Sequence, residues 1–127
     1  MISNQREFIR VKVVIHVELR VGGNVVIPGK IDNISLNGLL ICTDSIVPDQ
    51  TPCLVRIHLD GGTGGPTIEA NGQVVRAGSG KLAVQFSEIL GTEGMSHLQN
   101  LILYNSGHQV DQAEAEFQSH LGLKANS

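Results

Sequence analysis

The fold of this chain is decided by residues 11–21, which read VKVVIHVELRV. Apolar side chains recur there at every second position and alternate with charged or polar ones, and Val14 is the single apolar residue on the polar face. Because successive side chains of a strand point to opposite faces of a sheet, a period of two predicts one long strand with a buried face. Gly22 and Gly23 then supply the positive φ angles that a hairpin turn needs.

Further strand patterns follow at short intervals. Residues 25–34 return from the first hairpin, and Pro28-Gly29 within them predicts an edge or bulge position, because proline donates no ladder hydrogen bond. Turn residues then separate four more segments of strand-like pattern, residues 39–43, 53–59, 67–77 and 81–87. Six strands in sequence predict a mainly β fold, a small six-stranded antiparallel barrel.

After Phe86 the apolar period changes from two to that of a helix. Apolar residues recur at helical spacing between Met95 and Asn105, with Thr92 or Ser96 as the expected N-cap. We expect this C-terminal helix to pack over one mouth of the barrel. The sequence therefore predicts one domain over residues 1–105, composed of the barrel and its capping helix.

Residues 106–127 are a C-terminal tail with a weaker apolar stripe, formed by Val110, Ala113, Phe117 and Leu121. The stripe predicts a second, short amphipathic helix. Such a helix either docks on the chain's own barrel or pairs with a partner protein or a second copy as a homodimer, and the stripe is compatible with each.

Two short polar segments frame the first hairpin. Arg6 and Arg10 stand four residues apart just ahead of the first strand, and Asp32, Asn33 and Ser35 lie at the end of the second. A guanidinium forms paired hydrogen bonds with phosphate oxygens or a guanine edge, and it also stacks on a purine face. An asparagine amide both donates and accepts, as a guanine edge requires, and a serine hydroxyl is able to face phosphate or ribose. The two segments together predict an anion-binding pair.

In this order, residues 6–10 (REFIR) and 33–38 (NISLNG) resemble the signature of the PilZ domain, the bacterial receptor module for the second messenger cyclic di-GMP. Residues 72–76 (GQVVR) and 82–86 (LAVQF) look like the last two strands of that family, so the resemblance covers about residues 5–105. It implies a six-stranded barrel with a C-terminal helix. It also implies that cyclic di-GMP binds on the outer surface of the barrel, where the N-terminal arginine segment wraps onto it.

Carried over by position, the resemblance implies that Arg6 and Arg10 contact the guanine and phosphate groups of the ligand. Asn33, Ser35 and Gly38 would form the facing turn, and Gly38 would let the ligand approach the backbone. The predicted ligand-binding residues are thus Arg6, Arg10, Asp32, Asn33, Ser35 and Gly38. The chain departs from the family pattern at Ala83, where glycine is usual near the ligand surface, and in having a single arginine before Glu7, where many strong binders carry two.

Composition excludes several other functions. Nine Lys and Arg against twelve Asp and Glu give a formal net charge of −3, which argues against DNA or RNA as a partner, because nucleic acid needs a broad basic face. No apolar run approaches the length of a membrane span, so we expect a cytoplasmic protein. His, Cys and carboxylates show no metal-ligand spacing, and Ser35 has no identifiable histidine base, so neither a metal, a cofactor nor an enzyme is predicted.

The first functional hypothesis is a cyclic di-GMP receptor and adaptor. Ordering of its N-terminal arginine segment around the ligand would change the exposed surface and pass the signal to a protein partner in motility, secretion or polysaccharide machinery. The alternative is a PilZ-fold interaction module that binds no nucleotide. A third, a small barrel for RNA or single-stranded DNA, is disfavoured because one Tyr and three Phe provide too few stacking platforms.

Overall fold

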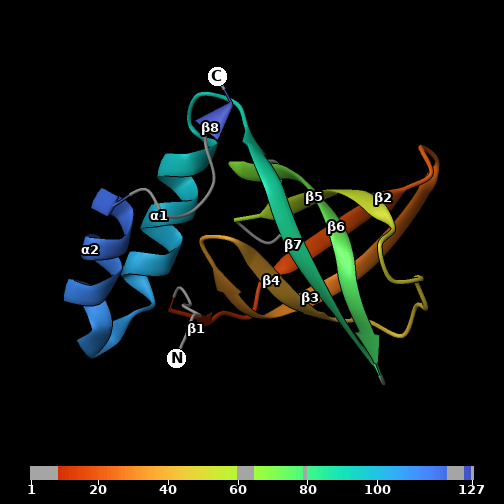
Figure 1. Cartoon of the computed structure of the whole chain (residues 1–127), viewed down its shortest axis with the longest axis horizontal. Helices are drawn as coiled ribbons and strands as arrows, with labels where there is room; N and C mark the ends of the chain where they lie inside the picture. Colours follow the sequence, from red (N-terminus) through yellow and green to blue (C-terminus); the bar gives the residue numbers. More distant parts are fainter. Residues whose placement is uncertain (1–8, 60–64, 79, 120–124, 127) are drawn as a thin grey trace.

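Six strands form a closed antiparallel barrel (Figure 1). The structure, a computed structural model, describes residues 9–59, 65–78, 80–119 and 125–126. Around the barrel the strands pair in the order β3, β2, β5, β6, β7, β4, and the pairing of β4 with β3 closes the ring. The strands are β2 (His16–Val21), β3 (Val25–Ser35), β4 (Gly38–Cys42), β5 (Pro52–His58), β6 (Thr67–Gly78) and β7 (Lys81–Leu90). The predicted mainly β, six-stranded fold is confirmed.

The first predicted strand is interrupted. Residues 11–21 form two strands, β1 (Val11–Lys12) and β2, which both pair with β3. The two pairings differ in register by one residue, because Lys12 is opposite Asn33 whereas His16 is opposite Lys30. The prediction of one continuous strand was therefore wrong. Its alternation still held, since Val11 and Val13 are buried and Val14 is 79% exposed.

The barrel interior is filled by aliphatic side chains from every strand. Alternation sends one set of side chains inward from each strand, as a half-buried strand requires. Side chains at most 3% exposed include Val17, Leu19, Ile31, Ile34, Leu39, Ile41, Val55, Ile57, Ile68, Val74, Leu82 and Val84.

The first hairpin follows the sequence prediction in part. Gly22 and Gly23 have the positive φ angles that were predicted for its turn. Residues 25–29 of β3 pair only with β2, so Pro28 stands at an edge as expected. The bulge of this strand lies farther along, at Asp32.

Two helices lie at one end of the barrel (Figure 1). In helix α1 (Gly94–Tyr104), Leu98 and Ile102 are buried as the helix packs against β6 and β7. The N-cap is Glu93 and has no side-chain capping bond, so the prediction of Thr92 or Ser96 was wrong. In the described part of the chain, no helix is long and apolar enough to span a membrane.

The C-terminal stripe does form the second helix that was predicted. A short 3-10 turn, η1 (Gly107–Gln109), leads into α2 (Val110–Ser119), which packs on α1 (Figure 1). Ala113 of the stripe is fully buried and Phe117 is partly buried, whereas Leu121 lies outside the described residues. The chain's own helix therefore covers this stripe. Strand β8 (Ala125–Asn126) pairs in parallel with the end of β7.

Candidate functional site

Pairing of β1 with the end of β3 brings the two predicted polar segments together. Val11 is opposite Ile34 and Lys12 is opposite Asn33, so Arg10, the residue before β1, lies beside this end of β3. Its Nη1 donates a hydrogen bond to Oδ1 of Asn33 over 2.7 Å. The bond joins residues that stand 23 positions apart in the sequence. Two predicted ligand-binding residues thus meet on the outer surface of the barrel.

A β-bulge at Asp32 explains why Asn33 faces outward. Ile31 and Asn33 pair with consecutive residues of β4, which leaves Asp32 as an extra residue in β3. Ile31 and Ile34 are both buried, so strict alternation between them would turn one of the two polar residues inward. The extra residue lets both polar side chains reach the outer surface, a use that bulges often have near functional sites.

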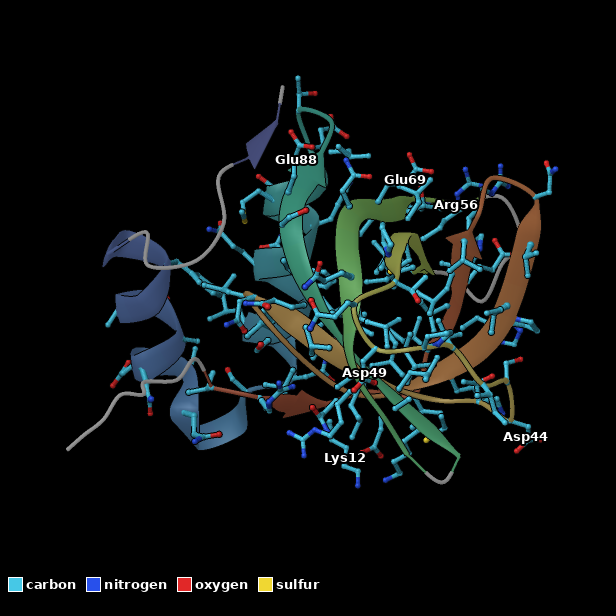
Figure 2. The ribbon with its side chains drawn as sticks, turned by 45° about the vertical axis from the view of Figure 1, so that its right-hand side comes forward. Lys12, Asp44, Asp49, Arg56, Glu69 and Glu88 are labelled. Atoms are coloured by element: carbon cyan, nitrogen blue, oxygen red, sulfur yellow. The ribbon has the colours of Figure 1, made fainter. Side chains whose placement is uncertain are left out.

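The Asp32 carboxylate is held by three side chains. Its Oδ1 lies 3.8 Å from Nζ of Lys12, and its Oδ2 lies 3.6 Å from Nζ of Lys81 on β7. Nδ2 of Asn33 donates a hydrogen bond to Oδ2 over 3.2 Å. Lys12 itself projects from the outer surface of the barrel (Figure 2). Asp32 therefore keeps two lysines close to the bonded pair of Arg10 and Asn33.

Beside this cluster the outer wall of the barrel is hollowed over a volume of about 330 Å³. A single row of cross-strand partners runs through the hollow, with Asn33 opposite Leu40, Leu40 opposite Ala83, and Ala83 opposite Arg76. The middle of the row is apolar and half-buried, and each end carries a polar or charged side chain. The lining residues are Arg10, Asn33, Leu39, Leu40, Arg76, Gly78, Lys81 and Ala83. Three cations and no carboxylate are among them, so the hollow suits a flat, anionic ligand.

Ser35 and Gly38 shape the turn between β3 and β4 and are not among the residues that line the hollow. Ser35 is 1% exposed, and its hydroxyl donates to Oδ1 of Asn37 over 2.8 Å. The backbone N–H of Asn37 lies 3.4 Å from the same hydroxyl. A Cβ on Gly38 would collide with the carbonyl oxygen of Val84 on the neighbouring strand. In the structure both residues therefore serve close packing of the turn.

Two further residues named from the sequence are Arg6 and Ala83. Arg6 lies outside the described residues, so its place is not defined. Ala83, the departure from the family pattern, does line the hollow.

The sequence predictions missed Arg76 of β6 and Lys81 of β7, two cations that line the hollow on the side away from Arg10. A signal existed, because Arg76 lies close to the end of β6 and Lys81 begins β7 across a tight hairpin. Strict alternation along β6, without a bulge, would turn Arg76 inward.

Among the described residues, no group of three or more His, Cys, Asp or Glu is close enough to hold a metal ion. The fold and the hollow instead define a class of protein, a small closed β-barrel with a hollow lined by cations on its outer wall. Comparison with protein families agrees, because the PilZ domain model matches residues 4–104. The chain belongs to the PilZ domain family.

Solved structures with similar folds support this assignment at the level of the fold. The PilZ domain of CeSA from a cellulose-synthesizing bacterium matches with a TM-score of 0.57 at 20% identity, covering 80% of this chain and 98% of that one. The inhibitor of motility MotI/DgrA from Bacillus subtilis matches with a TM-score of 0.65 at 20% identity, covering 86% of this chain and 53% of that one. The PilZ domain of YcgR from Escherichia coli, solved with c-di-GMP, matches with a TM-score of 0.60 at 12% identity, covering 87% and 98%. A sequence search of curated proteins finds no match.

Proposed function

We propose that this protein is a cyclic di-GMP receptor that binds the dinucleotide in the hollow beside Arg10 and Asn33. The observation that carries the proposal is the 2.7 Å bond between these two side chains at the rim of a cationic hollow with an apolar floor. A phosphodiester ligand needs cations and N–H donors, and a purine needs a flat apolar surface or a guanidinium to stack on. Membership of a family of cyclic di-GMP receptors supports the same ligand.

The described cations supply the charge that such a ligand requires. Arg10, Lys12, Arg76 and Lys81 surround the site with four positive charges, and Asp32 subtracts one. Asn33 already accepts from Arg10 through Oδ1, and its Nδ2 lies on Asp32. The bond therefore fixes the guanidinium of Arg10 at the rim, so part of the ordering cost of binding is met before the ligand arrives.

We further propose that the ligand acts by ordering the rest of the N-terminal arginine segment, from Arg6 up to the already bonded Arg10, against the barrel. Contacts from these two guanidiniums to one ligand would tie the residues before β1 to the hollow and create a new surface around it. A protein partner in motility, secretion or polysaccharide machinery would bind that surface. The proposed role is that of a cytoplasmic adaptor, in which binding rather than catalysis is the function.

Two observations favour a second candidate, a PilZ-fold interaction module that binds no nucleotide. Asp32 already occupies two of the lysines, and the Ala83 methyl group adds to the floor of the hollow where the family usually has glycine. Such a module would use the barrel or helix α2 to contact its partner.

Calorimetric titration of the whole chain with cyclic di-GMP, beside GTP and linear pGpG, decides between the two. We expect saturable binding of cyclic di-GMP and a loss of affinity in Arg10→Ala of about 10-fold or more, since a charge-assisted contact is lost. Arg20→Ala is the matched control. Arg20 is exposed on β2 and lies opposite Val26 of β3. Val26 is seven positions before Asn33, which is up to about 24 Å along the strand. No heat with the wild-type protein, together with an unshifted melting temperature at high ligand concentration, would exclude the receptor and favour the interaction module.

A further inference from the structure

Arg76 stands at the opposite end of the cross-strand row from Asn33. The row crosses β3, β4, β7 and β6, so three interstrand steps of about 4.8 Å separate its ends by about 14 Å along the barrel wall. Both end residues line the same hollow, and Leu40 and Ala83 form the floor between them. A ligand that fills the hollow therefore has a guanidinium available on each side, Arg10 on the wall of β3 and Arg76 on the wall of β6.

A second β-bulge turns Arg76 outward. Val74 pairs with Val84 while Arg76 pairs with Ala83, which leaves Val75 as an extra residue in β6. Val74 is fully buried, so uninterrupted alternation from this residue would point Arg76 into the core. The bulge exposes it instead. Each wall of the hollow thus contains a bulge, and each bulge brings a polar residue to the outer surface.

The cations of the hollow differ in what they already contact. Arg10 donates to Asn33, and Lys81 lies 3.6 Å from Asp32. Arg76 is exposed, and within the part of the chain that the structure describes its side chain has no hydrogen bond or ion pair. An arginine without a carboxylate partner, placed at the edge of a hollow, retains all of its donors for an incoming anion.

We infer that Arg76 is a second anchor of the site, which binds the phosphate of the cyclic dinucleotide that faces away from Arg10. A cyclic dinucleotide carries two phosphates on opposite sides of one ring, so a guanidinium on each wall engages both, and Lys81 adds charge beside Arg76. A mononucleotide has phosphate at one end only and reaches one wall. Arg76 would therefore contribute to selection for a ligand that spans the hollow. The inference rests on the proposed function, because it assigns a residue to the same ligand.

The test is calorimetric titration of the folded chain with cyclic di-GMP for five proteins, the wild type, Arg10→Ala, Arg76→Ala, Arg76→Lys and the control Arg20→Ala. We expect Arg76→Ala to bind about 10-fold more weakly or worse, while Arg20→Ala binds like the wild type. Arg76→Lys should retain part of the affinity, because it keeps the charge but loses the forked donors. Thermal melting checks that the variants are folded. If Arg76→Ala does not fold, the affinity of Arg76→Lys decides whether Arg76 is an anchor.

A double variant separates an anchor from a residue that merely shapes the site. If Arg10 and Arg76 hold different ends of the ligand, the losses in the Arg10→Ala, Arg76→Ala protein should multiply, because distant independent contacts are additive in free energy. Affinity of Arg76→Ala equal to that of Arg20→Ala would overturn the inference, and an effect of Arg10→Ala in the same series would leave the proposed function standing. A wild-type protein that binds no cyclic di-GMP would overturn both.

Discussion

Nη1 of Arg10 donates a 2.7 Å hydrogen bond to Oδ1 of Asn33, and this bond links the segment before β1 to the last residues of β3. It forms on the surface, so it contributes little to stability, but it sets where the guanidinium points. Two consequences follow for Asn33. Under the proposed function, its amide belongs to the ligand-binding surface and also positions Arg10 for the ligand.

Replacing Asn33 with Ala should therefore weaken cyclic di-GMP binding by several-fold, from the loss of about 0.5–1.5 kcal/mol in a hydrogen bond. The free energy of unfolding should change by less than about 0.5 kcal/mol, because the residue is at the surface. The effects of Asn33→Ala and Arg10→Ala on affinity should be less than additive in the double variant, since the two residues share one bond. Calorimetry on the four proteins of this cycle measures the coupling, and full additivity would show that the bond does not position Arg10.

Asp32 offers a test of charge within the same site. The sequence predicts it as a ligand contact, but its carboxylate is engaged by Lys12, Lys81 and Asn33. A negative charge near an anionic ligand is repulsive, so Asp32→Asn should bind cyclic di-GMP several-fold more tightly at low ionic strength. The gain should shrink toward zero near 1 M salt, where the screening length is about 3 Å.

Glu69→Gln is the matched control for Asp32→Asn. Glu69 lies beside Arg56, 2.7 Å from its Nε, far from Lys12 on the barrel (Figure 2). The change in net charge is the same, so an equal gain in affinity would indicate a general charge effect. Weaker binding by Asp32→Asn at every salt concentration would instead show that its carboxylate contacts the ligand directly.

The regular part of this molecule could be predicted from its sequence, and the irregular part could not. Alternation identified the six barrel strands, and helical spacing identified both helices, because each pattern reports burial over many residues. The two motifs identified Arg10 and Asn33, which do meet. The bulges at Asp32 and Val75 could not be predicted from the apolar alternation, because each depends on which residue of the neighbouring strand lies opposite.

The missed residues follow from those bulges. Arg76 reaches the hollow through a one-residue shift in pairing, and Lys81 meets Asp32 only because β7 closes on β4 beside β3. Ser35, in contrast, was predicted as a ligand contact, because a serine at this position fits either a ligand contact or a turn. Only the structure shows that its hydroxyl is buried and bonded to Asn37.

Gly38 should be far less tolerant of a methyl group than Gly78. A Cβ on Gly38 would meet the backbone carbonyl of Val84, whereas one on Gly78 would have no heavy atom within 4 Å. We expect Gly38→Ala to lower the free energy of unfolding by roughly 1–3 kcal/mol, as overpacking does, and Gly78→Ala to be nearly neutral. Urea unfolding of both variants measures the difference, and equal stability of the two would contradict the packing role of Gly38.

Ser35→Ala should act mainly on stability. The variant removes the 2.8 Å bond to Asn37 Oδ1 from a site that is 1% exposed, which predicts a loss of about 1 kcal/mol. Cyclic di-GMP affinity should fall less than in Arg10→Ala, because the hydroxyl faces the turn. The two variants compared by urea unfolding and by calorimetry test this order. A larger loss of affinity in Ser35→Ala, without a loss of stability, would assign the hydroxyl to the ligand.

Cys53 should make the stability of the barrel depend on pH under alkaline conditions. Burial raises the pKa of its thiol from 9.0 to about 11, because the thiolate would be poorly solvated inside the protein. Between these values the unfolded chain releases the thiol proton while the folded chain keeps it. The free energy of unfolding should therefore fall as pH rises from 9 to about 11, by roughly 1.4 kcal/mol for each pH unit at most, and should be unaffected by this group below pH 9.

The measurement compares urea unfolding of the wild type with Cys53→Ala at several pH values, because all other groups are the same in both proteins and their contributions cancel in the difference. The wild type should lose stability relative to Cys53→Ala only above pH 9. Cys42, which is exposed, provides the matched control, and Cys42→Ala should follow the wild type across the range. Parallel curves for all three proteins would show that the folded barrel accommodates the thiolate as readily as water does.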